Sequence, residues 1–249
     1  MKGRNIKKKE VVYMEAKKIE VKKYISISAR LKENYKSLRA NIDFCKNVPK
    51  VILITSSIPG EGKSTVSLRL ANEIAKSRKK VLMMDCDMRK SRWSELFGIS
   101  RQDKKGVSDF LAGKVSISDA LWQTDEPNLY IMLSGTTPPN PAELLGSEAF
   151  TKLLNACRQE FDYVLIDAPP MASVIDPAVI CSKCDGVLFV IASDMVSCRI
   201  VRRALQQIER AGGMILGAVL NKIKFSNRAL YGTYGTSKYY YSNYSKYYD

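Results

Sequence analysis

Histidine is absent from all 249 residues of the chain. It is the side chain that most often acts as a general acid or base near neutral pH, activates serine or cysteine nucleophiles and binds transition metals. Its absence therefore argues against all three kinds of site. Any proton transfer must use carboxylates, lysine, tyrosine or cysteine.

Long apolar runs and metal-binding cysteine patterns are also lacking. No apolar run approaches the ~18 residues of a membrane-spanning helix, and the N-terminus shows no apolar core of a secretory signal. The six cysteines are scattered, and the Cys181–Cys184 pair has neither a second pair nor histidines to complete a zinc site. These features predict a cytoplasmic protein with reduced thiols.

Acidic residues are few relative to basic ones. The chain has 40 Lys and Arg against 25 Asp and Glu, a net charge of +15. This imbalance indicates an acidic partner: nucleic acid, anionic lipid, an acidic protein segment or phosphate. Residues 1–28 share the basic excess and are expected to form a solvated N-terminal arm, with contact to the anionic inner face of a membrane as the functional alternative.

A buried strand, a glycine-containing loop and a helix are expected around residues 51–65, which read VILITSSIPGEGKST. In this context Gly60 and Gly62 would let backbone N–H groups surround a phosphate, next to the positive end of a helix. Lys63 would reach the β- and γ-phosphates, and the Ser64 hydroxyl would bind Mg²⁺. Ser57 replaces the glycine that usually opens such a P-loop, so the loop is a variant.

Two other apolar runs, at 81–84 and 163–166, end in acidic residues: Asp85 and Asp87 after the first, Asp167 after the second. Ligands of open α/β sheets bind at these carboxyl ends of strands. Further strands are expected at 129–133, 186–193 and 216–220. Helices are expected at 29–45, 142–160 and 198–210, and short helices within 92–123. This alternation predicts an α/β fold, a doubly wound and mostly parallel sheet of the P-loop NTPase type.

The C-terminal segment is rich in tyrosine and almost free of aliphatic residues. It holds eight of the thirteen tyrosines: Tyr231, Tyr234, Tyr239, Tyr240, Tyr241, Tyr244, Tyr247 and Tyr248. Such a segment cannot build a core. It is either a polar-aromatic tail like those of RNA-binding proteins or a set of phosphorylation acceptors.

Together, five boxes in order resemble the bacterial tyrosine kinases of capsule and exopolysaccharide operons, in the Gram-positive form where the kinase is a separate chain. The boxes are SSIPGEGKST, MMDCDMR, LIDAPP, SGTTPPNPAELL and the tyrosine cluster. The helix at 29–45 adds a variant of the family's ring-forming motif: Glu33, Lys36 and Arg39, with Lys36 where arginine is usual.

The resemblance implies the following assignments. The domains are a basic arm at 1–28, a kinase domain at 29–224 and a flexible tyrosine-rich tail at 225–249. Lys63 and Asp85 are catalytic, with Asp85 accepting the proton of the tyrosine. Ser64, Asp87 and Asp167 organise Mg²⁺, and the eight tail tyrosines are the phosphoacceptors. ATP is bound by Ser57, Pro59, Gly60, Glu61, Gly62, Lys63, Ser64, Thr65 and Asn221.

The resemblance also implies partners. These are the cytoplasmic tail of a transmembrane adaptor, further copies of the chain in a ring, protein substrates and a tyrosine phosphatase, but no nucleic acid. The chain would be recruited to the inner face of the plasma membrane. Two alternatives remain. A partition- or Min-type positioning ATPase would carry a signature lysine where this chain has Ile58. A non-enzymatic scaffold would not need the intact lysine and acids.

Overall fold

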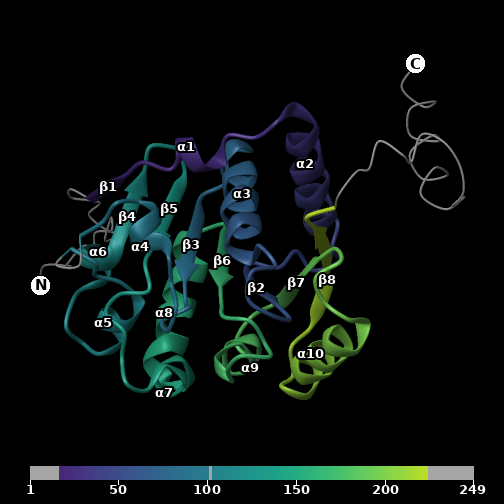
Figure 1. Cartoon of the computed structure of the whole chain (residues 1–249). Coiled ribbons are helices and arrows are strands. Elements are labelled where there is room, and N and C mark those ends of the chain that lie inside the picture. Colours follow the sequence, from purple (N-terminus) through teal and green to yellow (C-terminus); the bar gives the residue numbers. More distant parts are fainter. Residues whose placement is uncertain (1–16, 101–102, 224–249) are drawn as a thin grey trace, which may run out of the picture.

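One eight-stranded sheet organises the part of the chain that the computed structural model describes, residues 17–100 and 103–223 (Figure 1). The spatial order is β1-β4-β5-β3-β6-β2-β7-β8, and every neighbouring pair is parallel except β4 with β5. The strands are β1 (Lys17–Ile19), β2 (Val51–Ser56), β3 (Val81–Asp85), β4 (Leu121–Thr124), β5 (Leu129–Met132), β6 (Tyr163–Asp167), β7 (Gly186–Ala192) and β8 (Ile215–Asn221).

Helices cover both faces of the sheet and bury two separate hydrophobic cores. One core lies under α1 (Lys22–Ile25), α2 (Ala29–Asp43), α3 (Lys63–Lys76) and α4 (Trp93–Leu96). The other lies under α5 (Val107–Leu111), α6 (Ile117–Ala120), α7 (Pro141–Gly146), α8 (Glu148–Glu160), α9 (Asp176–Cys181) and α10 (Cys198–Arg210). The predicted doubly wound, mostly parallel fold is confirmed.

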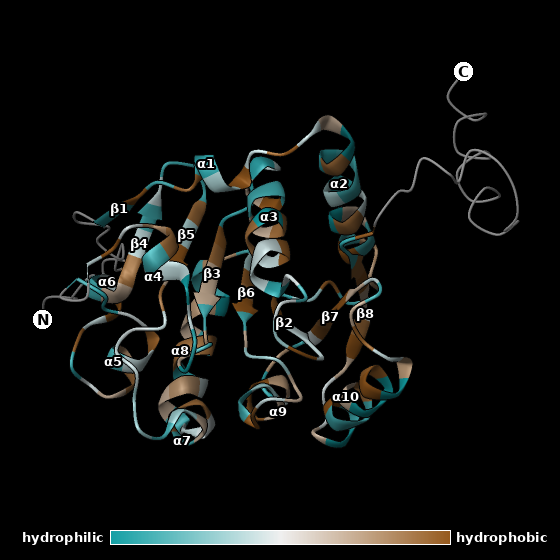
Figure 2. Ribbon diagram, in the orientation of Figure 1, coloured by the Kyte–Doolittle hydropathy of each residue, from teal (hydrophilic) through white to brown (hydrophobic). Residues whose placement is uncertain are grey.

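The central strands are apolar because both of their faces are covered. In β2, Val51 and Leu53 enter the core under α8 and α9, whereas Ile52 and Ile54 enter the core under α3. This alternation follows from the two-residue period of a strand. Figure 2 shows the same strands as the most hydrophobic part of the molecule.

The structure differs from the predicted elements at two places. Residues 121–124, expected within short helices, form β4 antiparallel to β5, because Trp122 and Thr124 alternate inward at a spacing of two. The helix expected at 142–160 is divided into α7 and α8. Ser147 separates them in an extended conformation, and its hydroxyl accepts the backbone N–H of Phe150 as the N-cap of α8.

Part of the predicted solvated arm at 1–28 belongs to the folded body. Strand β1 pairs with β4, the backbone N–H of Val21 donates to Asp125 at 2.7 Å, and Val21 and Ile25 are buried. Apolar contacts therefore hold this basic segment at the edge of the sheet. In the described part of the chain, no helix combines the length and the apolar character needed to cross a membrane.

Candidate active site

The loop between β2 and α3 has the backbone shape that its glycines predict. Gly60 and Gly62 have φ values of 86° and 93°, in the left-handed region that favours glycine. A Cβ at Gly62 would also collide with the side-chain amide of Asn221. Helix α3 begins directly at Lys63, so its free N–H groups face the end of the loop. This is the geometry of an anion-binding helix terminus.

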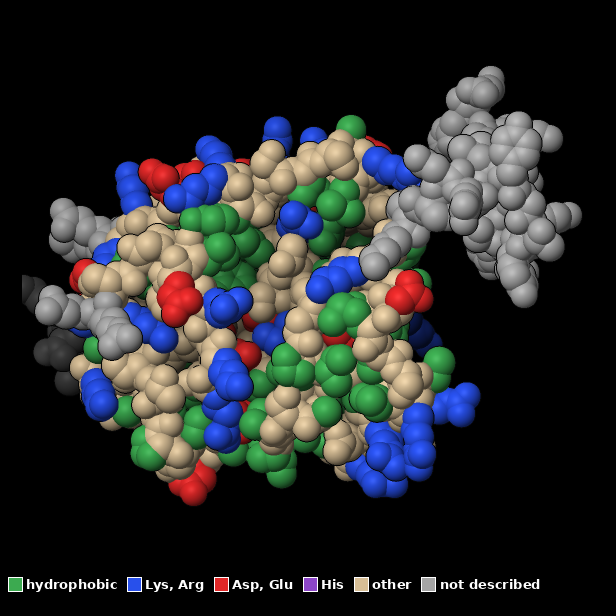
Figure 3. All heavy atoms as spheres, in the orientation of Figure 1, with side chains coloured by type: hydrophobic (Ala, Val, Ile, Leu, Met, Phe, Trp, Pro, Cys, Tyr) green, Lys and Arg blue, Asp and Glu red, His purple; other side chains and the backbone are tan. Residues whose placement is uncertain are grey.

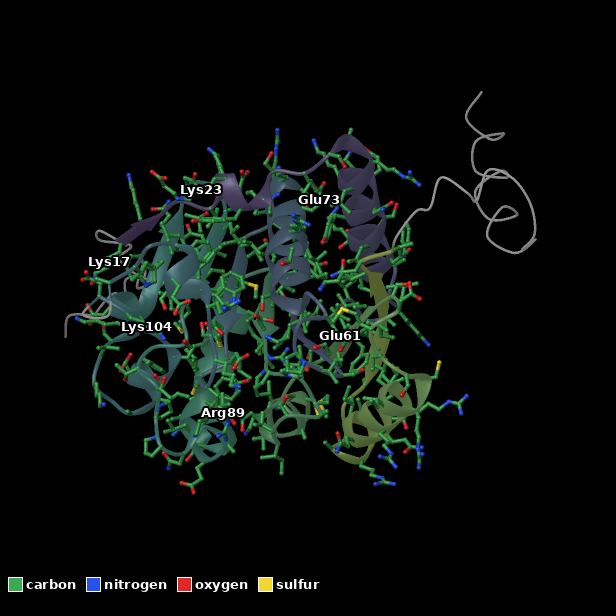
Figure 4. All side chains as sticks on the ribbon, viewed as in Figure 1. Lys17, Lys23, Glu61, Glu73, Arg89 and Lys104 are labelled. Carbon is green, nitrogen blue, oxygen red and sulfur yellow. The ribbon has the colours of Figure 1, made fainter. Side chains whose placement is uncertain are left out.

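Contacts from distant segments hold this loop in place. The buried Glu61 carboxylate accepts the N–H of Ile58 at 2.8 Å and the N–H of Ala192, at the end of β7, at 3.1 Å. Figure 4 shows Glu61 between the start of α3 and β8. From the end of β8, the Asn221 amide donates to the Glu61 carbonyl at 2.9 Å and Lys222 Nζ to the Gly60 carbonyl at 2.6 Å. The side chain of Glu61 thus braces the loop instead of facing a phosphate.

Lys63 is surrounded by oxygen atoms of the predicted site residues. Its Nζ lies 3.3 Å from Asp87 Oδ2, 3.5 Å from Asp167 Oδ1 and 3.3 Å from Ser64 Oγ. Burial lowers the pKa of Lys63, but the three nearby carboxylates raise that pKa by more, so the ammonium group stays charged. The sequence expectation that one cation and three acids meet at this point agrees with the geometry.

Asp85 is buried directly beside Asp167, its partner in the pairing of β3 with β6. The pKa of Asp85 is raised to about 7, mainly by burial and secondly by repulsion from Asp167. Three groups act in the opposite direction: the Ser91 hydroxyl, the Lys63 ammonium and the backbone N–H of Asp87. A carboxyl group with this pKa can accept a proton near neutral pH.

The oxygen atoms around Lys63 fit a small divalent cation. Ser64 offers a hydroxyl, and Asp87 and Asp167 offer carboxylates. No preformed group of three or more acidic, cysteine or histidine ligands exists among the described residues. Mg²⁺ is commonly held in this incomplete way, by one or two carboxylates together with substrate phosphates and water. The donor set therefore fits Mg²⁺ carried in with a nucleotide.

A cavity of about 910 Å³ opens over these groups. It is lined by the glycine loop with Lys63, Asp87 and Asp167, and also by Tyr24, Leu68, Arg69, Trp93 and Leu96. Figure 3 shows lysine and arginine side chains around a hollow on this face. Arg89, in the wall, forms a two-point ion pair with the buried Asp176 at 2.8 and 3.0 Å. The cavity is large enough for a nucleotide and has the basic rim that phosphates require.

Comparison with known proteins agrees with this geometry. The AAA domain family matches residues 49–214. The chain is 39% identical to the tyrosine-protein kinase CpsD of Streptococcus pneumoniae over 224 residues, which cover 90% of this chain and 96% of that protein. The chain belongs to the bacterial tyrosine-protein kinase family. The predicted resemblance and the P-loop NTPase fold are therefore confirmed.

Solved structures separate this family from the alternative ATPases. The chimerical protein CapA2B2 superposes with a TM-score of 0.76 at 30% identity, covering 84% of this chain and 94% of that one. The cell division ATPase MinD of Pyrococcus furiosus reaches a TM-score of 0.60 at 25% identity, covering 72% of this chain and 74% of that one. The tyrosine-kinase relationship is thus the stronger one, and the Min-type relationship is more distant.

Two groups of predicted residues are not placed at this site by the structure. Glu33, Lys36 and Arg39 lie on α2 and do not line the cavity; Lys36 Nζ is paired with Glu33 of its own helix at 2.7 Å. The eight tail tyrosines lie outside the described residues. The ring-forming and acceptor roles therefore stay predictions.

Sequence reasoning missed three side chains that touch the site: Ser91, Trp93 and Lys222. Ser91 Oγ donates to Asp85, and Trp93 Nε1 donates to Asp167 Oδ2 at 3.0 Å. Lys222 reaches the glycine loop from the end of β8. The first two follow the acidic DCDMR stretch by only a few residues, and this proximity was the one signal that the sequence offered.

Proposed function

We propose that the chain is an ATP- and Mg²⁺-dependent kinase that phosphorylates the tyrosine cluster at the C-terminus of a neighbouring copy and thereby regulates capsule or exopolysaccharide synthesis and export. One observation carries the proposal. Asp85, a buried carboxyl group, lies directly behind the wall of a nucleotide-sized cavity, beside Asp167 and in hydrogen-bond contact with Ser91, which both line it, in a chain that has no histidine. Transfer to a tyrosine hydroxyl needs such a base beside the phosphates.

The residues of the cavity divide into three roles. The backbone N–H groups of residues 60–65 and the Lys63 ammonium hold the β- and γ-phosphates, and Asn221 contacts the adenine. The oxygens of Ser64, Asp87 and Asp167 hold Mg²⁺, which supplies positive charge against the charge that develops on the phosphoryl oxygens. Asp85 accepts the proton of the attacking tyrosine, and its raised pKa favours proton uptake near neutral pH.

Transfer between copies is consistent with the length of the chain. Tyr231 follows Asn221 by ten residues, which span up to ~33 Å when extended. Each phosphate adds about −1.5 to −2 charge, so eight would add roughly −12 to −16, comparable in size to the net +15 of the chain. Phosphorylation therefore removes the attraction of the tail for a basic neighbour and favours dissociation of a ring.

The proposed partners follow from the family. Glu33, Lys36 and Arg39 contact the next copy in the ring, and the cytoplasmic tail of a transmembrane adaptor assembles the Mg²⁺ site and recruits the chain to the inner face of the plasma membrane. Protein substrates and a tyrosine phosphatase complete the cycle. Addition of the adaptor tail as a peptide should raise turnover of the isolated chain.

Incubation with ATP and Mg²⁺, followed by detection of phosphotyrosine, tests the reaction. A second experiment tests transfer between copies. Asp85→Asn protein, which keeps its tail but lacks the base, is mixed with a chain that ends at Leu230 and keeps the base but lacks the acceptors. Phosphotyrosine should appear only in the mixture, on the Asp85→Asn chain.

Each experiment has an outcome that would contradict part of the proposal. A positioning ATPase would hydrolyse ATP without producing phosphotyrosine. An unlabelled Asp85→Asn tail in the mixture, while the wild-type chain labels itself, would show that transfer occurs within one copy. Equal masses of the phosphorylated and dephosphorylated protein in light scattering would refute the dissociation step and leave the kinase assignment intact.

A further inference from the structure

We infer that Trp93 is a positioning residue for Asp167: its indole N–H fixes one carboxylate oxygen and leaves the other free for the metal–phosphate side of the site. The inference rests on the proposed function, because it assigns a role around the proposed Mg²⁺ site. Neither the family motifs nor the comparisons assign any role to this side chain.

The two oxygens of Asp167 have different partners. Oδ2 accepts the hydrogen bond of Trp93 Nε1 at 3.0 Å, and Oδ1 lies 3.5 Å from Lys63 Nζ. The Asp167 side chain is fully buried, and Trp93 is 3% exposed. Because this contact is shielded from water, the hydrogen bond keeps the orientation of the carboxylate. Oδ1 is thus held toward Lys63, where the phosphates and the cation would lie.

An indole suits this role for a chemical reason. Its N–H can only donate, so it cannot exchange roles with the carboxylate. It is also neutral, and it therefore adds no second cation that would compete with Mg²⁺ for Asp167. Partners of this kind, behind a metal ligand, orient the ligand, and their loss typically lowers metal affinity about 10- to 100-fold.

The surrounding contacts hold the indole itself. The Trp93 ring packs against Phe97 with centroids 5.5 Å apart, and Phe97 packs against Tyr24 of α1 with centroids 5.4 Å apart. The Trp93 backbone N–H donates to Ser91 Oγ at 3.2 Å, and that hydroxyl donates to Asp85. One turn of chain thus contacts both buried acids, Asp85 through Ser91 and Asp167 through Trp93.

The second tryptophan of the chain is a matched control. Trp122, in β4, is buried to a similar degree at 6% exposure, and among the described residues its Nε1 has no hydrogen-bond partner. It does not line the cavity. Trp122→Phe therefore removes an indole of similar burial without changing a contact to Asp167, whereas Trp93→Phe keeps an aromatic ring and removes the N–H.

Calorimetric binding of ADP to the full chain, with Mg²⁺ and with EDTA, tests the role without relying on turnover. We expect Trp93→Phe to weaken ADP binding in Mg²⁺ about tenfold and to leave binding in EDTA unchanged. Trp122→Phe should match the wild type in both conditions. If Trp93→Phe binds ADP as tightly as the wild type in Mg²⁺, or loses the same factor in EDTA, the positioning role is wrong.

A second variant covers the case in which Trp93→Phe does not fold. In the Trp122→Phe background, Trp93 is the remaining tryptophan. A tryptophan auxotroph can therefore replace it alone with β-(3-benzothienyl)alanine, which keeps the ring shape and has sulfur in place of N–H. The same tenfold, Mg²⁺-specific loss is expected, and unchanged binding overturns the inference. If the wild type binds ADP equally with and without Mg²⁺, the proposed metal site itself fails.

Discussion

Replacement of the proposed base, Asp85→Asn, should abolish phosphoryl transfer and at the same time stabilise the metal-free protein. In the fold, the pKa of Asp85 rises from 3.8 to about 7, first through burial and then through Asp167. In the unfolded chain neither burial nor Asp167 raises the pKa of Asp85. An ionised Asp85 therefore costs free energy on folding, and an asparagine at the same place does not.

The cost can be worked out from the pKa values. A shift of about three units at about 1.4 kcal/mol per unit corresponds to about 4 kcal/mol at pH 8. The substituted asparagine keeps both polar contacts, because its oxygen can accept the Asp87 N–H and its amide can donate to Ser91. We therefore expect a gain of about 2–4 kcal/mol, or roughly 5–15 °C in melting temperature for a domain of this size.

The sign of the pH dependence follows from the direction of the shift. Because the folded pKa is higher than the unfolded one, the folded state binds the proton more tightly. The contribution of Asp85 to stability is fully present below pH 3.8 and is lost as the pH rises through about 7. The difference in unfolding free energy between Asp85→Asn and the wild type should therefore be smaller by about 2–3 kcal/mol at pH 5 than at pH 8.

Urea unfolding of both proteins in EDTA, without nucleotide, at pH 8 and pH 5 measures this difference. Asp109→Asn is the matched control. Asp109 is also buried, but its negative charge lies in the first turn of α5 and accepts the N–H groups of Gly106 and Thr136 and the Thr136 hydroxyl, so a neutral amide should weaken these charge-assisted hydrogen bonds and destabilise the protein at both pH values. Equal destabilisation by Asp85→Asn at both pH values would refute the buried-charge argument.

Three other substitutions test contacts around the site and the sheet. Lys63→Met leaves Asp87 and Asp167 buried without their cation. It should therefore abolish phosphotransfer and lower the unfolding free energy of the metal-free protein by about 3–5 kcal/mol. Lys63→Arg, the control, should keep much of the stability. Gly62→Ala should lower ATP affinity at least tenfold in calorimetry, because its φ of 93° and the Asn221 amide leave no room for a Cβ. Asp185→Ala should cost about 2–4 kcal/mol in thermal unfolding, because Asp185 accepts the N–H groups of Lys50 and Val51 and pairs with Arg158 at 2.6 Å. Partial burial raises the pKa of Asp185, but the Arg158 guanidinium and these N–H groups lower that pKa by more. The stability that Asp185 contributes is therefore present above its pKa in the unfolded chain and is lost as the pH falls through its pKa in the folded protein.

The parts of the fold that local composition determines could be predicted from the sequence. The runs at 51–54, 81–84 and 163–166 are strands because both faces of each are buried, which favours unbroken apolar stretches. Asp85 and Asp167 meet because the strands that carry them are parallel neighbours. The glycines at 60 and 62 mark the loop because its backbone needs positive φ values.

The elements that depend on distant partners could not be predicted in the same way. Strand β1 has the sequence KKI, which carries no strand pattern of its own, and it is a strand because β4 and the adjoining Val21–Asp125 contact hold it. Glu61 looks like a phosphate contact because of its place in the loop. Its actual partner at the end of β7, Ala192, is 131 residues away. Trp93 and Asp167 are 74 residues apart.

The end of β8 connects the phosphate loop to the segment that leads into the tail. Asn221 and Lys222 both donate to carbonyl groups of the loop, at Glu61 and Gly60. Lys222 has a φ of 58°, which costs about 1–2 kcal/mol for a residue with a side chain, and its hydrogen bond to Gly60 offsets part of this cost. A displacement of the chain at this point would break both contacts. The backbone that is expected to bind the phosphates is thus held by residues that precede, in the sequence, the tyrosines that are predicted to be the acceptors.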